Sequence, residues 1–352
     1  MFDLIKGTIQ SSKVIEDENG LYPIISIAEK NKLTNNIHEK YLINGKNIFI
    51  ATTSSGTSCG PFETKIKYYD GICSYTNLLS KIQLNKDYKH KINIKYIYYI
   101  LKNNKKYIEE TYEKGLANKS LNIEKFKLMK IPIPSIEVQN KIIEYLDIIY
   151  EEVIKTNNEK IEKIKKLNKN YLDLNLQFNK DIEIKTLSEV CEFQNGTQLD
   201  KKDIINGDIP IFGGGFKIVG YHNNYNRNGN ETIICGTGNA GYVNHNYEKP
   251  FWASQCFTMK SKNNNIIIDK YLYYYSKIIL EKEFISNQKG TAIPYIRFTQ
   301  IIDLKIPIPS IEKQKEIIEY LEFNDNLIKT LEKENEINKN NAELLMKQIL
   351  YK

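Results

Sequence analysis

The 352-residue sequence lacks the short motifs that identify many nucleotide-dependent and DNA-modifying enzymes. It has no G-x-x-x-x-G-K-[ST] phosphate loop, which excludes the commonest type of ATP-driven motor. It has no Pro-Pro pair, so the Asn/Asp-Pro-Pro-aromatic motif of amino-methyltransferases is missing. Its four histidines are scattered without i,i+4 pairing, which argues against a metal site or a general base. We therefore expect a non-enzyme without a cofactor.

Cysteine pairs and long apolar runs are also missing. The five cysteines form no C-x-x-C motif, and an odd number without a signal peptide indicates reduced thiols and no structural zinc. No stretch reaches the roughly 18 uninterrupted apolar residues that a membrane span needs. These absences predict a soluble, cytoplasmic protein with no membrane partner.

Positive charge comes almost entirely from lysine. The formal net charge is +7, and among the 50 Lys and Arg residues only Arg227 and Arg297 are arginines. An excess of this kind favours an anionic partner such as nucleic acid, without identifying it.

One 18-residue segment occurs twice. KIPIPSIEVQNKIIEYLD begins at Lys130 and KIPIPSIEKQKEIIEYLE begins at Lys305, so 14 of 18 positions are identical in segments 175 residues apart. A solenoid has units of roughly 20–50 residues, which is far shorter than this period. The repeat unit is half of the chain, and the length suits two domains of ordinary size.

After each KIPIPS the apolar residues step mostly by three and four, which predicts a long helix. Ser135 and Ser310 stand at the N-cap positions. The first stripe comprises Ile142, Leu146, Ile149, Val153, Ile161, Ile164, Tyr171, Leu174 and Phe178, and the second comprises Ile317, Leu321, Ile328, Leu331, Leu345 and Ile349. Asn324, Asn335 and Asn338 lie on or beside the second stripe, where asparagine fixes register. We predict that the two helices form an antiparallel coiled coil within one chain.

The remaining segments predict two globules of mixed α/β (α+β) class, because short Ile, Tyr and Val runs alternate with Gly and Asn turns. Residues 207–226, 231–243 and 251–260 are predicted to form successive strands and hairpins, and residues 20–30, 46–62 and 69–82 follow in the same order in the first globule. Tyr-rich helices are predicted around Tyr96 and Tyr271, again 175 residues apart. The two halves should therefore share one fold as a pseudo-two-fold internal repeat.

The order globule, helix, globule, helix, with I-P-I-P-S-I-E-x-Q at each helix start, resembles the specificity subunit of type I restriction-modification systems. The resemblance covers essentially the whole chain. PIFGGG at 210–215, GTGNAGYV at 236–243 and FWAS at 251–254 are similar to the motifs of a target recognition domain in that family. The resemblance implies that each globule binds one half of a bipartite site on double-stranded DNA. It also implies that the helices set the spacing and dock two methyltransferase subunits, and through them a restriction and translocase subunit.

The resemblance divides the chain into a first target recognition domain at 1–133, a spacer helix at 134–180, a second domain at 181–308 and a second helix at 309–352. Gly196 in FQNGTQL has 17 residues between it and Phe178, whereas Gly7 in LIKGTIQ has only six residues before it. We therefore expect the first domain to lack an opening strand. Such a strand could be supplied from elsewhere, the start could be truncated, or the domain could manage without it.

Candidate DNA-contacting residues follow from the chemistry of base edges and phosphates. Arg227 and Arg297 are candidate guanine readers, with a phosphate clamp or a surface salt bridge as the alternative. A tight loop and the strand after it carry four further candidates, with a plain hairpin as the alternative: Asn239, Tyr242, Asn244 and His245.

Two further loops complete the candidate set. Thr53 and Ser55 in IATTSSGTSCG offer hydroxyl groups to phosphates or bases, although a solvent loop explains them equally well. Lys114, Lys119 and Lys289 follow a helix in KGLANKS and KGTAIPY, and we expect them to contact phosphates.

Two other function classes stay open from the sequence. One is a stand-alone DNA-binding decoy or regulator with the same fold and no enzyme partners. The other is a coiled-coil scaffold whose basic charge is incidental. Co-purification with a methyltransferase would separate the specificity subunit from the decoy, and sequence-selective DNA binding would exclude the scaffold.

Overall fold

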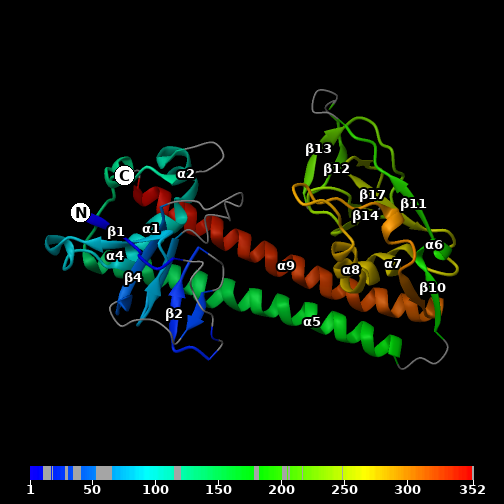
Figure 1. The fold of residues 1–352 in the computed structure, drawn as a ribbon, viewed down its shortest axis with the longest axis horizontal. Helices are drawn as coiled ribbons and strands as arrows, with labels where there is room; N and C mark the ends of the chain where they lie inside the picture. The colour runs from blue at the N-terminus through cyan, green and yellow to red at the C-terminus, as the bar shows by residue number, and fades with distance from the viewer. Residues whose placement is uncertain are drawn as a thin grey trace. The chain divides into compact units, whose positions relative to one another are not determined.

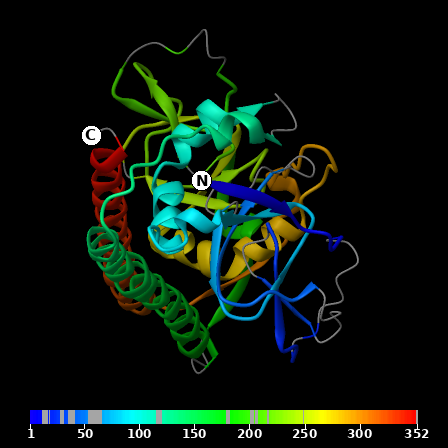
Figure 2. The ribbon, with the colours of Figure 1, turned by 90° about the vertical axis from the view of Figure 1, so that its left-hand side faces the viewer.

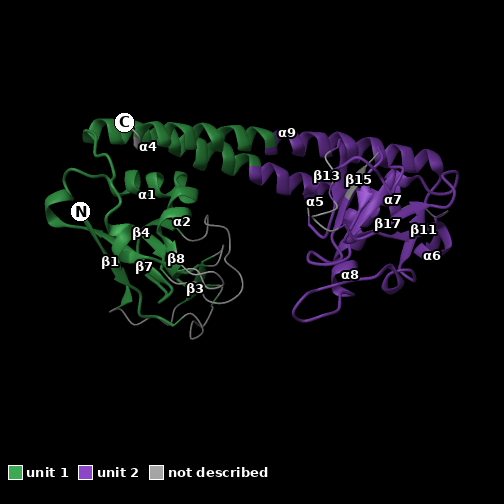
Figure 3. Ribbon diagram, turned by 90° about the horizontal axis from the view of Figure 1, so that it is seen from above, with its two compact units in different colours: residues 1–157, 333–352 green, residues 158–332 purple. Residues whose placement is uncertain are grey.

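The computed structural model describes residues 1–10, 17, 19–27, 31–34, 41–52, 66–114, 120–177, 182–199, 204, 207–215, 217–247 and 249–350. The chain forms two compact units (Figure 3). Unit 1 comprises residues 1–157 and 333–352, and unit 2 comprises residues 158–332. Each unit therefore contains one globule together with a segment of each long helix.

Unit 1 is built on a four-stranded antiparallel sheet in the order β1 (Phe2–Lys6), β7 (Leu79–Leu84), β4 (Lys46–Ala51) and β5 (Ile66–Asp70). A smaller sheet has the order β3 (Lys32–Thr34), β2 (Tyr22–Ile25) and β6 (Ser74–Tyr75), with β2 and β6 parallel. The other elements of the globule are η4 (Lys86–Tyr88), α1 (Ile94–Asn103), α2 (Lys105–Tyr112), β8 (Glu113–Lys114), β9 (Ser120–Leu121) and α3 (Ile123–Lys127).

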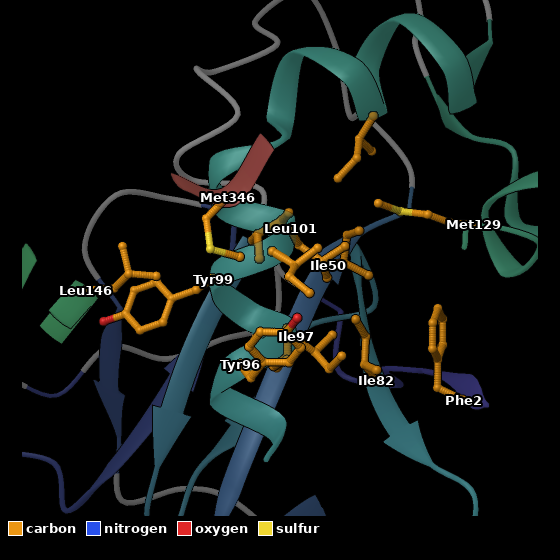
Figure 4. Packing of buried hydrophobic residues seen from close by; sticks show 14 of the residues in the cluster. Phe2, Ile50, Ile82, Tyr96, Ile97, Tyr99, Leu101, Met129, Leu146 and Met346 are labelled. Atoms are coloured by element: carbon orange, nitrogen blue, oxygen red, sulfur yellow. The ribbon is translucent and has the colours of Figure 1, made fainter. Parts of the chain in front are cut away.

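Strand β4 is paired on both edges, and both of its faces are buried. Ile48 and Ile50 point into the main core with α1, whereas Phe49 joins a second cluster with Ile25 and Cys73. A strand covered on both faces is a continuous apolar run, which explains the sequence NIFIA at this position. Figure 4 shows the main core, with side chains of α1 packed over the sheet.

Unit 2 repeats this topology. Its main sheet has the order β11 (Cys191–Asn195), β17 (Cys256–Ser261), β14 (Glu231–Cys235) and β15 (Val243–Tyr247). Its smaller sheet has the order β13 (Ile218–His222), β12 (Ile209–Phe212) and β16 (Trp252–Ala253), again with one parallel pair. The helices are α7 (Asp269–Tyr275), the π-helix η7 (Ser276–Leu280), α8 (Glu281–Ser286) and η8 (Phe298–Gln300). The shared strand order confirms the predicted internal repeat of a mixed α/β fold.

One part of unit 2 has no counterpart among the described residues of unit 1. Strand β10 (Glu183–Thr186) pairs with β18 (Lys305–Ile308), and α6 (Leu187–Val190) follows it. In unit 1, β1 takes the position of β11, but nothing in the described residues corresponds to β10 and α6.

The long helices pack together, as predicted. The first consists of α4 (Ile136–Asp147), the π-helix η5 (Ile148–Ile154) and α5 (Lys155–Gln177), and the second is α9 (Ile311–Leu350). In unit 2, α5 and α9 lie side by side (Figure 1). Asn324 Nδ2 donates to Asn168 Oδ1 at 2.6 Å, and the rings of Tyr171 and Tyr320 stack with centroids 3.9 Å apart. Since one residue number rises while the other falls, α5 and α9 run in opposite directions in this unit.

In unit 1 the C-terminal part of α9 packs against the first helix (Figure 2). Met346 of α9 enters the core beside Leu146 and Leu101 (Figure 4). Asn157 Nδ2 donates to Asn335 Oδ1 at 3.1 Å, so this unit also contains a buried asparagine pair. No helix in the described residues is both long and apolar enough to cross a membrane.

The apolar stripe of the first helix differs from the prediction at one step. Leu174 is 53% exposed, and Leu172 is fully buried instead. Asn168 belongs to the buried seam because it pairs with Asn324, so the seam continues four residues later at Leu172. The prediction of Leu174 was wrong because it passed over this asparagine, and Phe178 lies outside the described residues.

The glutamine of the repeated I-E-x-Q motif fastens each helix to its own globule. Gln314 is fully buried, and its Oε1 accepts a hydrogen bond from the Ile268 N–H at 2.8 Å. Its Nε2 donates to the carbonyls of Ile266 and Pro309 at 2.8 and 2.9 Å. Gln139, also fully buried, makes the same three bonds in unit 1, with Asn93, Lys91 and Pro134 as its partners.

Two further contacts repeat at this junction. Tyr271 donates its hydroxyl to the Pro307 carbonyl at 2.9 Å, and Tyr96 does the same to Pro132 at 3.0 Å. The equivalent ion pairs between globule and helix are Lys270–Glu322 at 2.6 Å and Lys95–Asp147 at 2.7 Å. Each globule is therefore held on its helix in the same way.

Candidate nucleic-acid interface

The loop that carries Lys289 and leads to Arg297 is closed by its own backbone. Lys289 and Tyr295 exchange two N–H···O=C hydrogen bonds of 2.8 Å. Gly290 has φ of +87°, and a Cβ there would lie 2.5 Å from the Ile293 carbonyl oxygen. Only glycine fits this position, which explains the Gly of KGTAIPY. Lys289 is exposed at the base of the loop, and its contact with a phosphate stays a prediction.

The same loop is anchored to the hairpin between β14 and β15. The Ile296 N–H donates to the Gly236 carbonyl at 2.8 Å, and the Gly238 N–H donates to the Pro294 carbonyl at 3.1 Å. Arg297 follows directly and is exposed. Within the described part of the chain, no side-chain partner holds its guanidinium, so its planar donor fork is available to a ligand.

Asn239 and Asn244 are fastened to the glycine run of PIFGGG. The Asn239 N–H donates to the Gly214 carbonyl, and Asn244 Nδ2 donates to the Gly215 carbonyl, both at 3.1 Å. A Cβ on Gly214 would lie 2.2 Å from the carbonyl oxygen of Thr237, so the two loops touch through their backbones. The glycine motif of the sequence therefore serves to bring these loops together.

The hairpin interpretation accounts for the other glycines of GTGNAGYV. Gly238 and Gly241 have φ of +74° and +85°, which L-residues rarely adopt. Asn239 and Tyr242 are half-buried at the turn. A role for either side chain in DNA contact stays a prediction.

An open groove of about 620 Å³ lies beside Arg297. The groove contains amides, hydroxyls and one guanidinium, which are the groups that recognise base edges and phosphates. Its lining residues are Asn195, Gly196, Gly236, Thr237, Ser254, Gln255, Cys256, Phe257, Ile293, Tyr295, Ile296 and Arg297.

Two polar residues of the groove, Asn195 and Gln255, were not predicted from the sequence. Asn195 and Gln255 are exposed, and the Gln255 carbonyl accepts from the Gly236 N–H at 3.0 Å. Glutamine and asparagine amides can bond adenine at two atoms. Gln255 directly follows FWAS and Asn195 directly precedes Gly196, so their place beside recognised motifs was the available signal.

Arg227 lies in a different environment. It is 7% exposed, and its Nε donates to Thr258 Oγ1 at 3.0 Å. Its other nitrogens donate to the carbonyls of Asn226 and Asn195, and Glu231 lies 3.5 Å from Nε. All of these acceptors are within the protein, so the contacts of Arg227 are structural. Guanine reading by Arg297 stays a prediction.

The first globule is described only in part at the predicted contacts. Thr53, Ser55 and Lys119 lie outside the described residues. Lys114 pairs through its backbone with Ser120, which matches the pairing of Lys289 with Tyr295 in unit 2. His245 belongs to β15, and its side chain is outside the description.

Burial makes the described cysteines poor nucleophiles. Desolvation raises the pKa of the Cys73, Cys191 and Cys256 thiols to about 12, and that of Cys235 to about 11. The thiolate is the reactive and metal-binding form, so these thiols stay protonated near neutral pH. Among the described residues, no three His, Cys, Asp or Glu side chains are grouped so that they could hold a metal ion.

Comparison with known proteins shows which family the sequence belongs to. The family model "Type I restriction modification DNA specificity domain" matches residues 1–166 and 179–339. The chain is 26% identical to the type I restriction enzyme MjaVIII specificity subunit of Methanocaldococcus jannaschii, over 94% of this chain and 86% of that protein. It is also 30% identical to a protein of Mycoplasma pneumoniae named as a type I specificity subunit, over 47% of this chain and 44% of that relative's length.

Solved structures share the fold. The S subunit of a type I restriction-modification system from M. genitalium superposes with a TM-score of 0.60 at 18% identity, covering 99% of this chain and 93% of that chain. A structure from work on complex assembly of a type I restriction-modification system gives a TM-score of 0.50 at 14% identity, covering 99% and 96%. Because the family model matches both halves of the sequence, the chain belongs to the type I restriction-modification DNA specificity family, as a specificity subunit and thus a non-catalytic component of such a system.

Proposed function

We propose that this specificity subunit recognises a bipartite site on double-stranded DNA, with each globule binding one half. The observation that carries the proposal is the repeated junction between globule and helix. Gln139 and Gln314 make the same three hydrogen bonds, so two globules of one fold are each held firmly on a helix. Two similar readers in one chain suit a target with two separate half-sites.

In unit 2 the proposed DNA surface is the groove beside Arg297. Arg297 supplies two donors to guanine O6 and N7, and Gln255 supplies a donor and an acceptor to adenine. Lys289, on the neighbouring loop, contacts a phosphate and so positions the domain without reading sequence. Asn239 and Tyr242 lie on the adjoining hairpin. In unit 1 the corresponding loops contain Thr53, Ser55, Lys114 and Lys119.

The proposed partners follow from the family. The helices hold the two globules at a fixed spacing and offer docking surfaces to two methyltransferase subunits in the cytoplasm. A restriction and translocase subunit then joins through the methyltransferases. The mutual contacts of α5 and α9 support this role, since a paired helix resists bending better than a single one.

Selection from random duplexes tests the proposal. The chain is co-expressed with the methyltransferase subunits of its own system, purified, and used to enrich DNA against excess competitor. We expect an enriched site of two short specific blocks separated by an unspecified spacer, with block centres about one helical turn apart. A single uninterrupted block would contradict the bipartite proposal. Selective DNA binding without co-purifying methyltransferase would instead favour a decoy, and no selectivity would favour a scaffold.

A further inference from the structure

Cys235 and Cys256 lie directly opposite each other in the main sheet of unit 2. Cys235 is the last residue of β14 and Cys256 is the first residue of β17, and the antiparallel register pairs the two. Residues that face each other across an antiparallel pair of strands point to the same side of the sheet. The two side chains are therefore direct neighbours.

Backbone hydrogen bonds show which kind of pair the two cysteines form. The Gly236 N–H donates to the Gln255 carbonyl at 3.0 Å, so the bond between the strands joins the residues next to the cysteines. The Cys235 N–H donates to the Tyr242 carbonyl, away from β17. Cys235 and Cys256 are thus a non-hydrogen-bonded pair, in which the Cα atoms are about 4.5 Å apart. A disulfide needs a Cα separation of about 4.4–6.8 Å, which this pair meets.

Both thiols contact the same segment, residues 212–215. The Cys256 thiol donates to the Phe212 carbonyl at 3.5 Å, and the Cys235 thiol donates to the Gly215 carbonyl at 3.7 Å. Burial, and next the nearby Cys235, raise the pKa of the Cys256 thiol to about 12. These contacts place the two sulfur atoms on one side of the sheet and close to each other.

The pairing is specific to this position. Within the described residues, no other cysteine faces a second cysteine across a pair of strands. Cys191 is also buried, but Ser261 lies opposite it. In unit 1 the corresponding pair is Ala51 and Leu79, at the end of β4 and the start of β7. The repeated fold therefore accepts an apolar pair here, and packing alone does not require two thiols.

We propose that Cys235 and Cys256 are a reversible oxidation site, at which a peroxide converts the two thiols into a disulfide that joins β14 to β17 beside the groove. The disulfide ties together the strand ends that lead to Gly236 and from Gln255, both of which line the groove. Both sulfur atoms also stop donating to residues 212–215. The inference concerns the redox chemistry of unit 2 and does not depend on DNA recognition.

The reaction begins at Cys256, because Cys256 lines the groove whereas Cys235 is fully buried. Its sulfur displaces water from hydrogen peroxide and becomes a sulfenic acid. The Cys235 sulfur then attacks the sulfenic sulfur, which forms the disulfide and releases a second water. The two thiols lose two electrons and two protons in total, and the peroxide is reduced to two waters. Burial slows the first step, because little thiolate is present, whereas the second step is favoured by proximity.

Hydrogen peroxide is the probe, and the full chain carries Cys59→Ser because Cys59 lies outside the described residues. After treatment the remaining thiols are alkylated in urea, and the digested peptides are analysed by mass spectrometry with and without a thiol reductant. We expect one linked pair of peptides, containing Cys235 and Cys256, that separates on reduction. Cys191 should be alkylated, because no cysteine faces it.

Two further variants test whether the link depends on the facing pair. Cys256→Ser keeps a donor of similar size near Phe212 but removes one sulfur, so no link should form at Cys235. Cys191→Ser is the matched control, since it removes another buried thiol of the same sheet, and the link between Cys235 and Cys256 should still form.

Hydrogen exchange measures how the disulfide holds the strands. The Gly236 amide, next to the disulfide, should exchange at least about tenfold more slowly in the oxidised chain, because opening of this end of the ladder is restrained. The Thr52 amide makes the corresponding bond to Leu78 in unit 1 and should be unchanged. The proposal is overturned if peroxide leaves Cys235 and Cys256 unlinked, if either links to another cysteine, or if Gly236 exchange does not slow.

Discussion

At the proposed interface, the surroundings of an arginine are not predictable from the sequence, whereas some of the glycines are. Arg227 and Arg297 look alike in the sequence, each following a loop of the second globule. Arg227 is buried because it reaches Thr258 and Asn195, which are 31 and 32 positions away. No local pattern predicts such distant contacts. Gly214 of PIFGGG and Gly238 and Gly241 of GTGNAGYV, by contrast, were recognisable, because close backbone approach at the first and positive φ at the other two favour glycine.

The burial of Arg227 makes stability the expected readout of its substitution. Arg227→Ala leaves the Glu231 carboxylate and two carbonyls without their donor, which should lower the free energy of unfolding by about 3–5 kcal/mol. Arg297→Ala is the control, and as an exposed substitution it should change stability by no more than about 0.5 kcal/mol. Urea unfolding of both variants checks this. Equal stability of the two variants would show that the internal bonds of Arg227 matter little.

Arg297→Lys separates base reading from simple charge. Lysine keeps the cation but loses the planar fork that grips two acceptors, so a guanine reader should lose about 1–3 kcal/mol of discrimination at one base pair. A phosphate contact would lose little. Affinities for the selected site and its single-base variants, measured at several salt concentrations, give the answer.

Lys289→Ala provides the matched comparison. It should weaken binding to all sequences alike and reduce the slope of log affinity against log salt by about one. If Arg297→Lys leaves every base preference unchanged, Arg297 is not the guanine reader.

At the level of elements, the two long helices and their partnership were predictable from apolar spacing. The buried pairs Asn168–Asn324 and Asn157–Asn335 were predicted only on one side, because the sequence indicates an asparagine near the seam but not its partner. The π-helical stretch Ile148–Ile154 was not predicted, since its residues fit an α-helical pattern equally well. Which polar residues are buried between two helices depends on the residues of the facing helix.

Gln139 and Gln314 fasten the long helices to the globules. Gln314→Ala leaves the Ile268 N–H and the carbonyls of Ile266 and Pro309 without this partner, and the Pro309 bond is the buried one of the three. A buried group left without its partner costs about 1–3 kcal/mol. We expect unit 2 to unfold at a lower urea concentration, with exchange of the Ile268 amide accelerated. Gln348→Ala, an exposed substitution on the same helix, should be close to neutral. Equal effects of the two substitutions would contradict the role assigned to Gln314.

At the scale of the whole molecule, the repeat determined most of what the sequence could predict. The 14 identities in 18 positions predicted two globules of one fold, and the strand orders of units 1 and 2 agree. Ile133 is 39% exposed and its counterpart Ile308 is 8% exposed, a difference that could not be predicted from those segments, because their sequences are the same. The repeated sequence predicts the shared fold, whereas the exposure of each copy depends on the residues that pack against it.

A domain exchange tests whether each globule reads its own half of a divided DNA site. Residues 1–130 are replaced by the corresponding domain of another type I specificity subunit with a different target, and both Gln139 and the helices are kept. DNA selected by the hybrid with its methyltransferase partners is then compared with DNA selected by the parent chain. We expect one half of the bipartite site to change while the other half and the spacer length stay the same. A change in both halves, or the loss of the divided site, would contradict it.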